Sequence, residues 1–197
     1  GRIESLLSRF EARGFRNLEP AELELGDGGH LFLGDNGAGK TSLIEGVYLL
    51  ATTRSFRTPR IQDCVRHDGD SFFLRGETGD RAQLEVGWVE GERVRRARGA
   101  KVSLAEHLAV LPVVSWTQTD LDVLVGPPQA RRRFLDRGVI GRRPTAISAI
   151  SRYRRALQEK RKLLQNASRG DVDQLDPWNR VLAAASHELA QLRFQQV

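Results

Sequence analysis

A glycine-rich stretch in the first quarter of the chain carries the residues with the clearest chemistry. Residues 34–42 read GDNGAGKTS and match the pattern G-x-x-x-x-G-K-[ST] in full. Glycines adopt positive φ at little cost, so a loop rich in them can turn several backbone amides toward one anion. The lysine adds a positive charge for phosphate oxygens, and the hydroxyl after it is a magnesium ligand in loops of this kind. This stretch, called the phosphate loop below, predicts a nucleoside-triphosphate site.

Each position in the phosphate loop has an expected role. Lys40 should reach the β- and γ-phosphates, Thr41 should bind Mg²⁺, and Ser42 should touch the α-phosphate. The backbone cradle is expected to consist of Gly34, Asp35, Asn36, Gly37, Ala38 and Gly39. The alternative is a chance glycine turn followed by Lys-Thr. A strand before the loop and a helix after it are the context that separates the two interpretations.

The segments around the loop predict that context. Short apolar runs favour strands over residues 3–15, 21–25 and 30–33, whereas residues 42–52 have the apolar spacing of a helix. A proline at the start of residues 59–65 is expected to open a short helix there. The loop should therefore join a strand to a helix.

The middle of the chain returns to strand-like sequence. Glycine turns separate apolar runs between residues 71 and 101, and they predict an antiparallel meander. Ser103 and Glu106 have the spacing of a capping box at the start of a short helix. The apolar residues 112–116 are a further candidate strand.

The last third of the chain has the pattern of helices. One long helix is expected over about residues 145–166, and a second should begin with Asp176 as N-cap and Pro177 as first residue. Together they predict an αα-hairpin. The expected domains are an α/β lobe over residues 1–118 and an α-helical lobe over residues 119–197.

Charge and composition narrow the class of protein. The 197 residues carry a net charge of +6, and residues 131–162 alone hold twelve arginines and lysines against two acids. Clustered positive charge attracts nucleic acid, although a solvated helix face has the same composition. A single cysteine, Cys64, excludes an internal disulfide framework and indicates a reducing compartment. Because no long apolar stretch occurs, we expect a cytoplasmic protein without a membrane partner.

Four sequence segments, taken together and in their order along the chain, carry a family resemblance. They are FRNL at 15–18, GDNGAGKTSLIEGVYLLATTRSFRT at 34–58, TDLDVLVGPPQARRRFLD at 119–136 and YRRALQEKRKLL at 153–164. Together they resemble the RecF family of bacterial recombination mediators. The resemblance extends over essentially the whole chain but reaches only the N-terminal half or so of a typical family member. It implies an α/β P-loop ATPase head of the ABC/SMC type, with a mixed β lobe around the P-loop helix and an α-helical lobe.

The resemblance also implies a function. RecF proteins are ATP-dependent DNA-binding proteins of recombinational repair, replication restart and the SOS response. They act at single-stranded gaps and at junctions of single- and double-stranded DNA. There they work with RecR and promote RecA loading in place of single-strand-binding protein. Two heads enclose ATP and Mg²⁺ as a homodimer, slow hydrolysis serves as a switch, and the family is cytoplasmic and associated with the nucleoid.

Further site residues are implied by their positions in or beside the matching strings. Arg16 in FRNL would lie near the nucleotide, and Gln118 falls where related heads keep a glutamine that senses Mg²⁺ and the γ-phosphate. A plain surface charge is the alternative for Arg16, and an exposed loop residue is the alternative for Gln118. The candidate DNA contacts are Arg54, Arg57, Arg60, Arg131, Arg132, Arg133, Arg154 and Arg155.

Two parts of an ABC-type head have no counterpart in the sequence. No apolar strand ends in the aspartate that holds Mg²⁺, and no serine-glycine signature loop occurs. We therefore assign no catalytic residue and expect this chain to bind nucleotide, weakly or partially, without turning it over. An SMC-like structural head for chromosome tethering is the alternative function. A small-molecule P-loop kinase agrees less well with the long meander.

Overall fold

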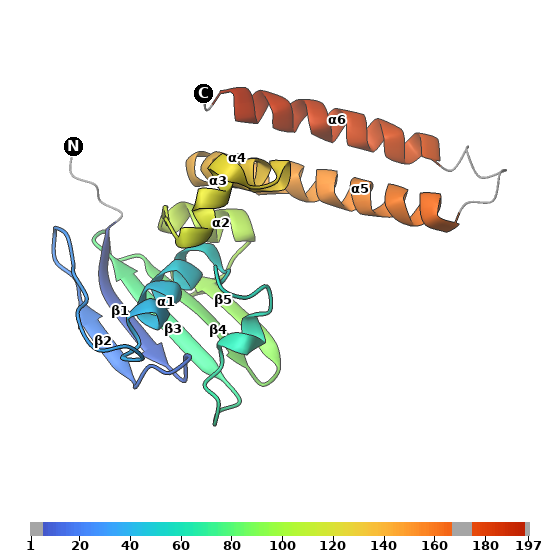
Figure 1. The fold of residues 1–197 in the computed structure, drawn as a ribbon. Coiled ribbons are helices and arrows are strands. Elements are labelled where there is room, and N and C mark those ends of the chain that lie inside the picture. Colours follow the sequence, from blue (N-terminus) through green and yellow to red (C-terminus); the bar gives the residue numbers. More distant parts are fainter. Residues whose placement is uncertain (1–5, 167–174, 196–197) are drawn as a thin grey trace. The chain divides into compact units, whose positions relative to one another are not determined.

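The computed structural model describes residues 6–166 and 175–195, and the chain divides into two compact units, residues 1–115 and 116–197 (Figure 1). The first unit contains a β-sheet and the helix that follows the phosphate loop. The second unit is helical and contains an antiparallel pair of long helices. The predicted fold class, a β lobe around a P-loop helix together with an α-helical part, is confirmed.

The sheet of the first unit has six strands in the order β2-β1-β3-β4-β5-β6, and every neighbouring pair is antiparallel. The strands are β1 (Leu7–Arg13), β2 (Ala21–Glu24), β3 (Phe72–Thr78), β4 (Gln83–Val89), β5 (Glu92–Ala97) and β6 (Ala100–Lys101). Strands β3 to β6 form a meander. Along β3 the residues Phe72, Leu74 and Gly76 are buried in alternation with more exposed ones, because one face of the sheet packs on the core.

Helix α1 (Lys40–Thr52) lies across this buried face of the sheet (Figure 1). Its residues Leu49 and Leu50 are fully buried in the core of the first unit. Gly46 allows the close approach, since a Cβ atom there would lie 2.9 Å from the ring of Phe10. The helix is thus held rigidly against the sheet, with its first residue at the phosphate loop.

Helix α2 (Leu104–Val110) also belongs to the first unit and begins with the predicted capping box. The Ser103 side chain accepts a hydrogen bond from the Glu106 amide, and the Glu106 carboxylate accepts one from the Ser103 amide. His107 is buried, and its Nε2 lies 2.7 Å from the Leu50 carbonyl oxygen at the end of α1. The capping prediction is confirmed.

Two predicted strands are absent from the described part of the chain. Residues 30–33, which precede the phosphate loop, and residues 112–116 pair with no strand there. Leu31, Leu33 and Val114 are 81%, 82% and 95% exposed. The predictions were wrong because an apolar run becomes a strand only when a neighbouring strand accepts its backbone hydrogen bonds. The helix predicted over 59–65 is likewise shorter, a 3-10 turn at Ile61–Cys64.

The second unit contains four α-helices in its described part: α3 (Asp122–Val125), α4 (Pro128–Arg142), α5 (Ile147–Asn166) and α6 (Leu175–Phe194). Short 3-10 turns lie at Gln118–Leu121 and Pro144–Ala146. Helices α5 and α6 pack side by side and bury Ile150, Ala185 and Leu189 (Figure 1). The predicted αα-hairpin is therefore confirmed, although α6 begins at Leu175 and Asp176 lies inside it rather than at its N-cap.

Buried carboxylates tie the second unit together. Asp136 on α4 accepts hydrogen bonds from Arg154 on α5 and, at 2.6 Å, from Arg193 on α6. Asp120 forms a similar ion pair with Arg137.

The expected turn after α5 falls on residues 167–174, outside the described residues. Among the described helices, none has both the length and the apolar character that crossing a bilayer requires.

Candidate nucleotide-binding site

The backbone of the phosphate loop has the conformation that its glycines predict. Gly37 and Gly39 both have a φ of 88°, which residues with side chains rarely adopt. Gly39 is also buried, and a Cβ atom there would lie 2.7 Å from Leu18 Cδ2. Glycine is therefore required at position 39 for two independent reasons, its backbone angle and its contact with Leu18.

The N-terminus of α1 offers backbone amides to an anion. Its N-cap residue is Gly39, which supplies no side-chain hydrogen bond, and the first turn contains no acidic residue. The Leu43 amide is the first to bond within the helix, at 2.8 Å from the Gly39 carbonyl oxygen. The amides of Lys40, Thr41 and Ser42 have no partner within the helix, whereas the Ala38 amide bonds to the Asp35 carbonyl oxygen. The helix dipole favours negative charge at this end.

The Lys40 side chain folds back over the loop that precedes it. Its Nζ donates hydrogen bonds to the carbonyl oxygens of Gly34 at 2.6 Å and Asp35 at 2.8 Å. The ammonium group is therefore held beside the amides of the loop. A phosphate bound there would offer anionic oxygens, which bind an ammonium more strongly than neutral carbonyl oxygens do.

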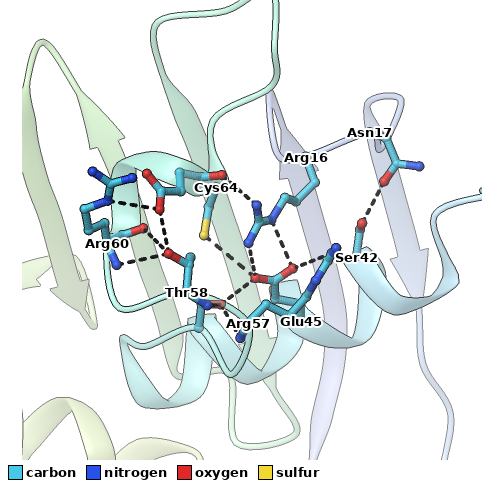
Figure 2. A network of polar contacts seen from close by, with 10 residues as sticks. Arg16, Asn17, Ser42, Glu45, Arg57, Thr58, Arg60 and Cys64 are labelled. Carbon is cyan, nitrogen blue, oxygen red and sulfur yellow. Dashed lines mark hydrogen bonds and ion pairs between the residues drawn. The ribbon is translucent and has the colours of Figure 1, made fainter.

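The FRNL string supports the loop from a distant part of the sequence. Asn17 donates a hydrogen bond from Nδ2 to the Gly37 carbonyl oxygen at 2.7 Å. It also accepts one from the buried Ser42 hydroxyl at 2.7 Å (Figure 2). Leu18 packs beneath Gly39. The sequence did not single out Asn17, because nothing in its local pattern indicates a partner some twenty residues away.

Arg16 lies beside the loop but is directed at an acid. Its guanidinium donates to both oxygens of Glu45, at 3.1 and 2.7 Å, and to the carbonyl oxygen of Asp63 at 2.7 Å (Figure 2). Burial raises the pKa of Glu45, but hydrogen bonds from Arg16 and Ser55 outweigh it and hold that pKa below its ordinary value. The carboxylate is therefore charged at neutral pH. No local sequence signal distinguished Glu45 as a site residue.

These residues surround an open cavity of about 830 Å³, which is within the usual range for small-molecule sites. One wall is the phosphate loop from residue 36 to residue 42. The rest of the lining comes from Asp63 and residues 65–68, together with Arg16, Asn17 and Arg57. The phosphate loop therefore borders a cavity that is larger than the loop itself requires.

Comparison with known proteins agrees with this geometry. The family described as the AAA domain matches residues 9–176, which is most of the chain. The chain belongs to the AAA domain family. The matched region includes the phosphate loop, helix α1 and the Arg16–Glu45 pair, so the site described above lies within the part that this AAA domain shares with its relatives.

Individual relatives indicate a narrower group of proteins than the AAA domain family. The chain is 34% identical to the DNA replication and repair protein RecF of Cronobacter sakazakii over 194 residues and 33% identical to that of Proteus mirabilis over 196. These alignments cover 95% of the chain but 53% and 54% of the relatives, so the chain spans about half their length. Solved structures of the recombination mediator protein RecF in the RecFOR pathway, with ATPrS and with ATP, superpose with TM-scores of 0.88 and 0.86. Both are 27% identical and cover 96% of the chain and 53% of the solved chain.

Of the two expected magnesium ligands, Thr41 and Gln118, the structure describes the side chain of Thr41 only. Thr41 lines the cavity and is exposed. Gln118 begins a 3-10 turn in the second unit, and its side chain is outside the described part of the structure. Within the described residues, no cluster of His, Cys, Asp and Glu side chains could hold a metal ion alone. Magnesium here would depend on Thr41, water and phosphate oxygens.

The candidate DNA contacts fall into two groups. Arg57, Arg60 and Arg154 are paired with the acids Glu45, Asp63 and Asp136. The others are exposed and form no ion pair within the described residues; they are Arg54, Arg131, Arg132, Arg133 and Arg155. Arg131 does donate to the Gly126 carbonyl oxygen. The unpaired group keeps its charge available for phosphates.

One cationic cluster was not recognised in the sequence. Arg93 and Arg95 are two residues apart on β5, so they share a face of the sheet. Desolvation, followed by the nearby charges of Arg54 and Arg95, holds the pKa of Arg93 below its ordinary value. Among the described residues no carboxylate pairs with any of these three arginines. Arg54 is distant from the other two in sequence, and only the fold brings the three together.

Proposed function

We propose that this chain is the ATP-binding portion of a RecF-type DNA replication and repair protein. The observation that carries the proposal is the phosphate loop in its cavity: left-handed glycines, uncapped amides at the start of α1, and the Lys40 ammonium beside them. The similarity to solved RecF structures with ATP and ATPrS supports adenine nucleotide as the ligand. The Thr41 hydroxyl, which lines the cavity directly after Lys40, supports Mg²⁺ as its companion ion.

The proposal extends to the complete protein. Two ATP-loaded heads associate as a homodimer, and slow ATP turnover acts as a switch for DNA binding at gaps and junctions of single- and double-stranded DNA. With RecR, the protein promotes RecA loading in place of single-strand-binding protein. The relatives are named DNA replication and repair protein and recombination mediator protein, and these names support this role. A cytoplasmic, nucleoid-associated location follows from it.

The helical hairpin supports this proposal over an SMC-like tethering head. Helices α5 and α6 have 20 residues each, which corresponds to about 30 Å of helix. An arm of that length is a short projection and does not provide the long coiled coil of a tether. We propose that the unpaired arginines on α4, including Arg132 and Arg133, contact DNA phosphates without reading bases.

Isothermal titration calorimetry of the 197-residue chain with ATP and Mg²⁺ tests the proposal. The unsubstituted chain should bind, and Lys40→Ala should reduce the affinity by at least about tenfold because it removes the ammonium from the phosphate loop. Lys101→Ala is the matched control, since Lys101 is an exposed lysine on β6, outside the cavity. Absence of binding by the unsubstituted chain, or equal loss in both variants, would contradict the proposal.

A further inference from the structure

The buried carboxylate of Glu45 accepts hydrogen bonds from two arginines and a serine. Glu45 is 0% exposed and lies on α1 one turn after Thr41. It accepts two hydrogen bonds from Arg16, one from Arg57 at 3.1 Å and one from the Ser55 hydroxyl at 2.5 Å (Figure 2). Two guanidinium groups therefore share one buried acid.

Both of these arginines line the cavity, whereas Glu45 does not. The acid lies behind them, on the rigid helix that begins at the phosphate loop. Arg16 is fixed by three hydrogen bonds, because its third donor, Nη1, reaches the Asp63 carbonyl oxygen. The position of the Arg16 guanidinium at the cavity wall is thus set by its bonds to Glu45 and to the backbone of the 3-10 turn.

The two arginines are held to different degrees. The Arg16 side chain is 19% exposed and bonds to both carboxylate oxygens, whereas the Arg57 side chain is 45% exposed and makes a single bond to Glu45. A buried carboxylate without a counter-charge is strongly unfavourable. Because two cations share this acid, one of them can turn toward a phosphate while the other keeps Glu45 neutralised.

We propose that Glu45 is a positioning residue of the nucleotide site, which sets two guanidinium groups at the cavity wall for an anionic ligand without touching that ligand itself. The proposal rests on the proposed function, since the anionic ligand is taken to be the phosphate chain of a nucleotide. It adds Glu45 and Arg57 to a nucleotide site that the sequence had limited to the phosphate loop, Arg16 and Gln118.

A double-mutant cycle in the 197-residue chain tests this role, with ATP and Mg²⁺ affinity as the measurement. Glu45→Gln should lower the affinity about tenfold, because Arg16 loses the charge that orients it. In an Arg16→Gln background the same change should have a smaller effect, since only Arg57 then remains for Glu45 to position. An acid that only stabilised the fold would reduce affinity by the same factor in both backgrounds, and that result would overturn the proposal.

A conservative variant keeps the proposal falsifiable if Glu45→Gln fails to fold. Arg16→Lys preserves the charge but cannot bond to both oxygens of Glu45, so it should lose affinity by a similar factor. Unchanged affinity in Arg16→Lys would show that charge alone matters and would overturn the positioning role. Glu22→Gln, which removes an exposed partner of Arg9 on the sheet, is the control and should bind normally. If the unsubstituted chain does not bind ATP, the proposed function fails and this inference fails with it; if only Glu45→Gln is without effect, the inference alone fails.

Discussion

The arginines beside the phosphate loop and those at the start of α4 have the same chemistry but opposite surroundings. Arg16 and Arg57 converge on one fully buried carboxylate. Arg132 and Arg133 are exposed and have no partner among the described residues. The first pair is therefore held beside the cavity by an acid, whereas the second pair is not held by any ion pair among the described residues. Charge counted along a sequence does not distinguish these cases, because the position of the acids decides between them.

The largest expected effect is on stability and tests the buried half of this comparison. Glu45→Ala leaves two guanidinium groups without their shared acid, and breaking a buried ion pair typically costs about 3–5 kcal/mol. We expect a loss of this size in the free energy of unfolding of the first unit, measured by urea denaturation with a probe confined to that unit. Glu22→Ala, which breaks an exposed pair with Arg9, should cost less than about 1 kcal/mol. Equal effects would show that Glu45 is no more important than a surface acid.

A smaller effect is expected where the backbone of the loop is strained. Gly39→Ala places a Cβ at a φ of 88° and 2.7 Å from Leu18, which should cost about 1–3 kcal/mol and reduce ATP affinity. Gly141→Ala on α4 is the matched control, since a Cβ there meets nothing within 4 Å. It should be neutral or stabilising by up to about 1 kcal/mol, because alanine favours a helix. Thermal unfolding and calorimetry measure the two quantities.

The smallest effect on stability is expected at the unpaired arginines. Substituting Arg132 and Arg133 together with glutamine should change the free energy of unfolding by less than about 0.5 kcal/mol, since no ion pair is lost. DNA affinity should fall, and the slope of log affinity against log salt should decrease by about one for each phosphate contact removed. Fluorescence anisotropy at ~50 to ~200 mM salt measures this. An unchanged salt slope would exclude these two residues as phosphate contacts.

The sequence by itself determined the local features of this protein. Glycines at positive φ, the lysine after them and the helix that follows are encoded within 34–52, because each depends on near neighbours in the chain. The Ser103–Glu106 capping box and the two long helices of the second unit were predictable for the same reason. The conformation of the loop and the helix after it could therefore be predicted from the residue types and their spacing, whereas the strand expected before the loop could not.

Only the tertiary structure decided which residues meet across the fold. The expected strands at 30–33 and 112–116 do not form within the described part of the chain, because strand formation depends on a neighbour that no local pattern guarantees. Arg16 and Glu45 are separated by 29 positions, and their ion pair exists because β1 and α1 pack on the same core. Whether an arginine is held or free depends on where the chain brings a carboxylate, and that is a property of packing rather than of sequence spacing.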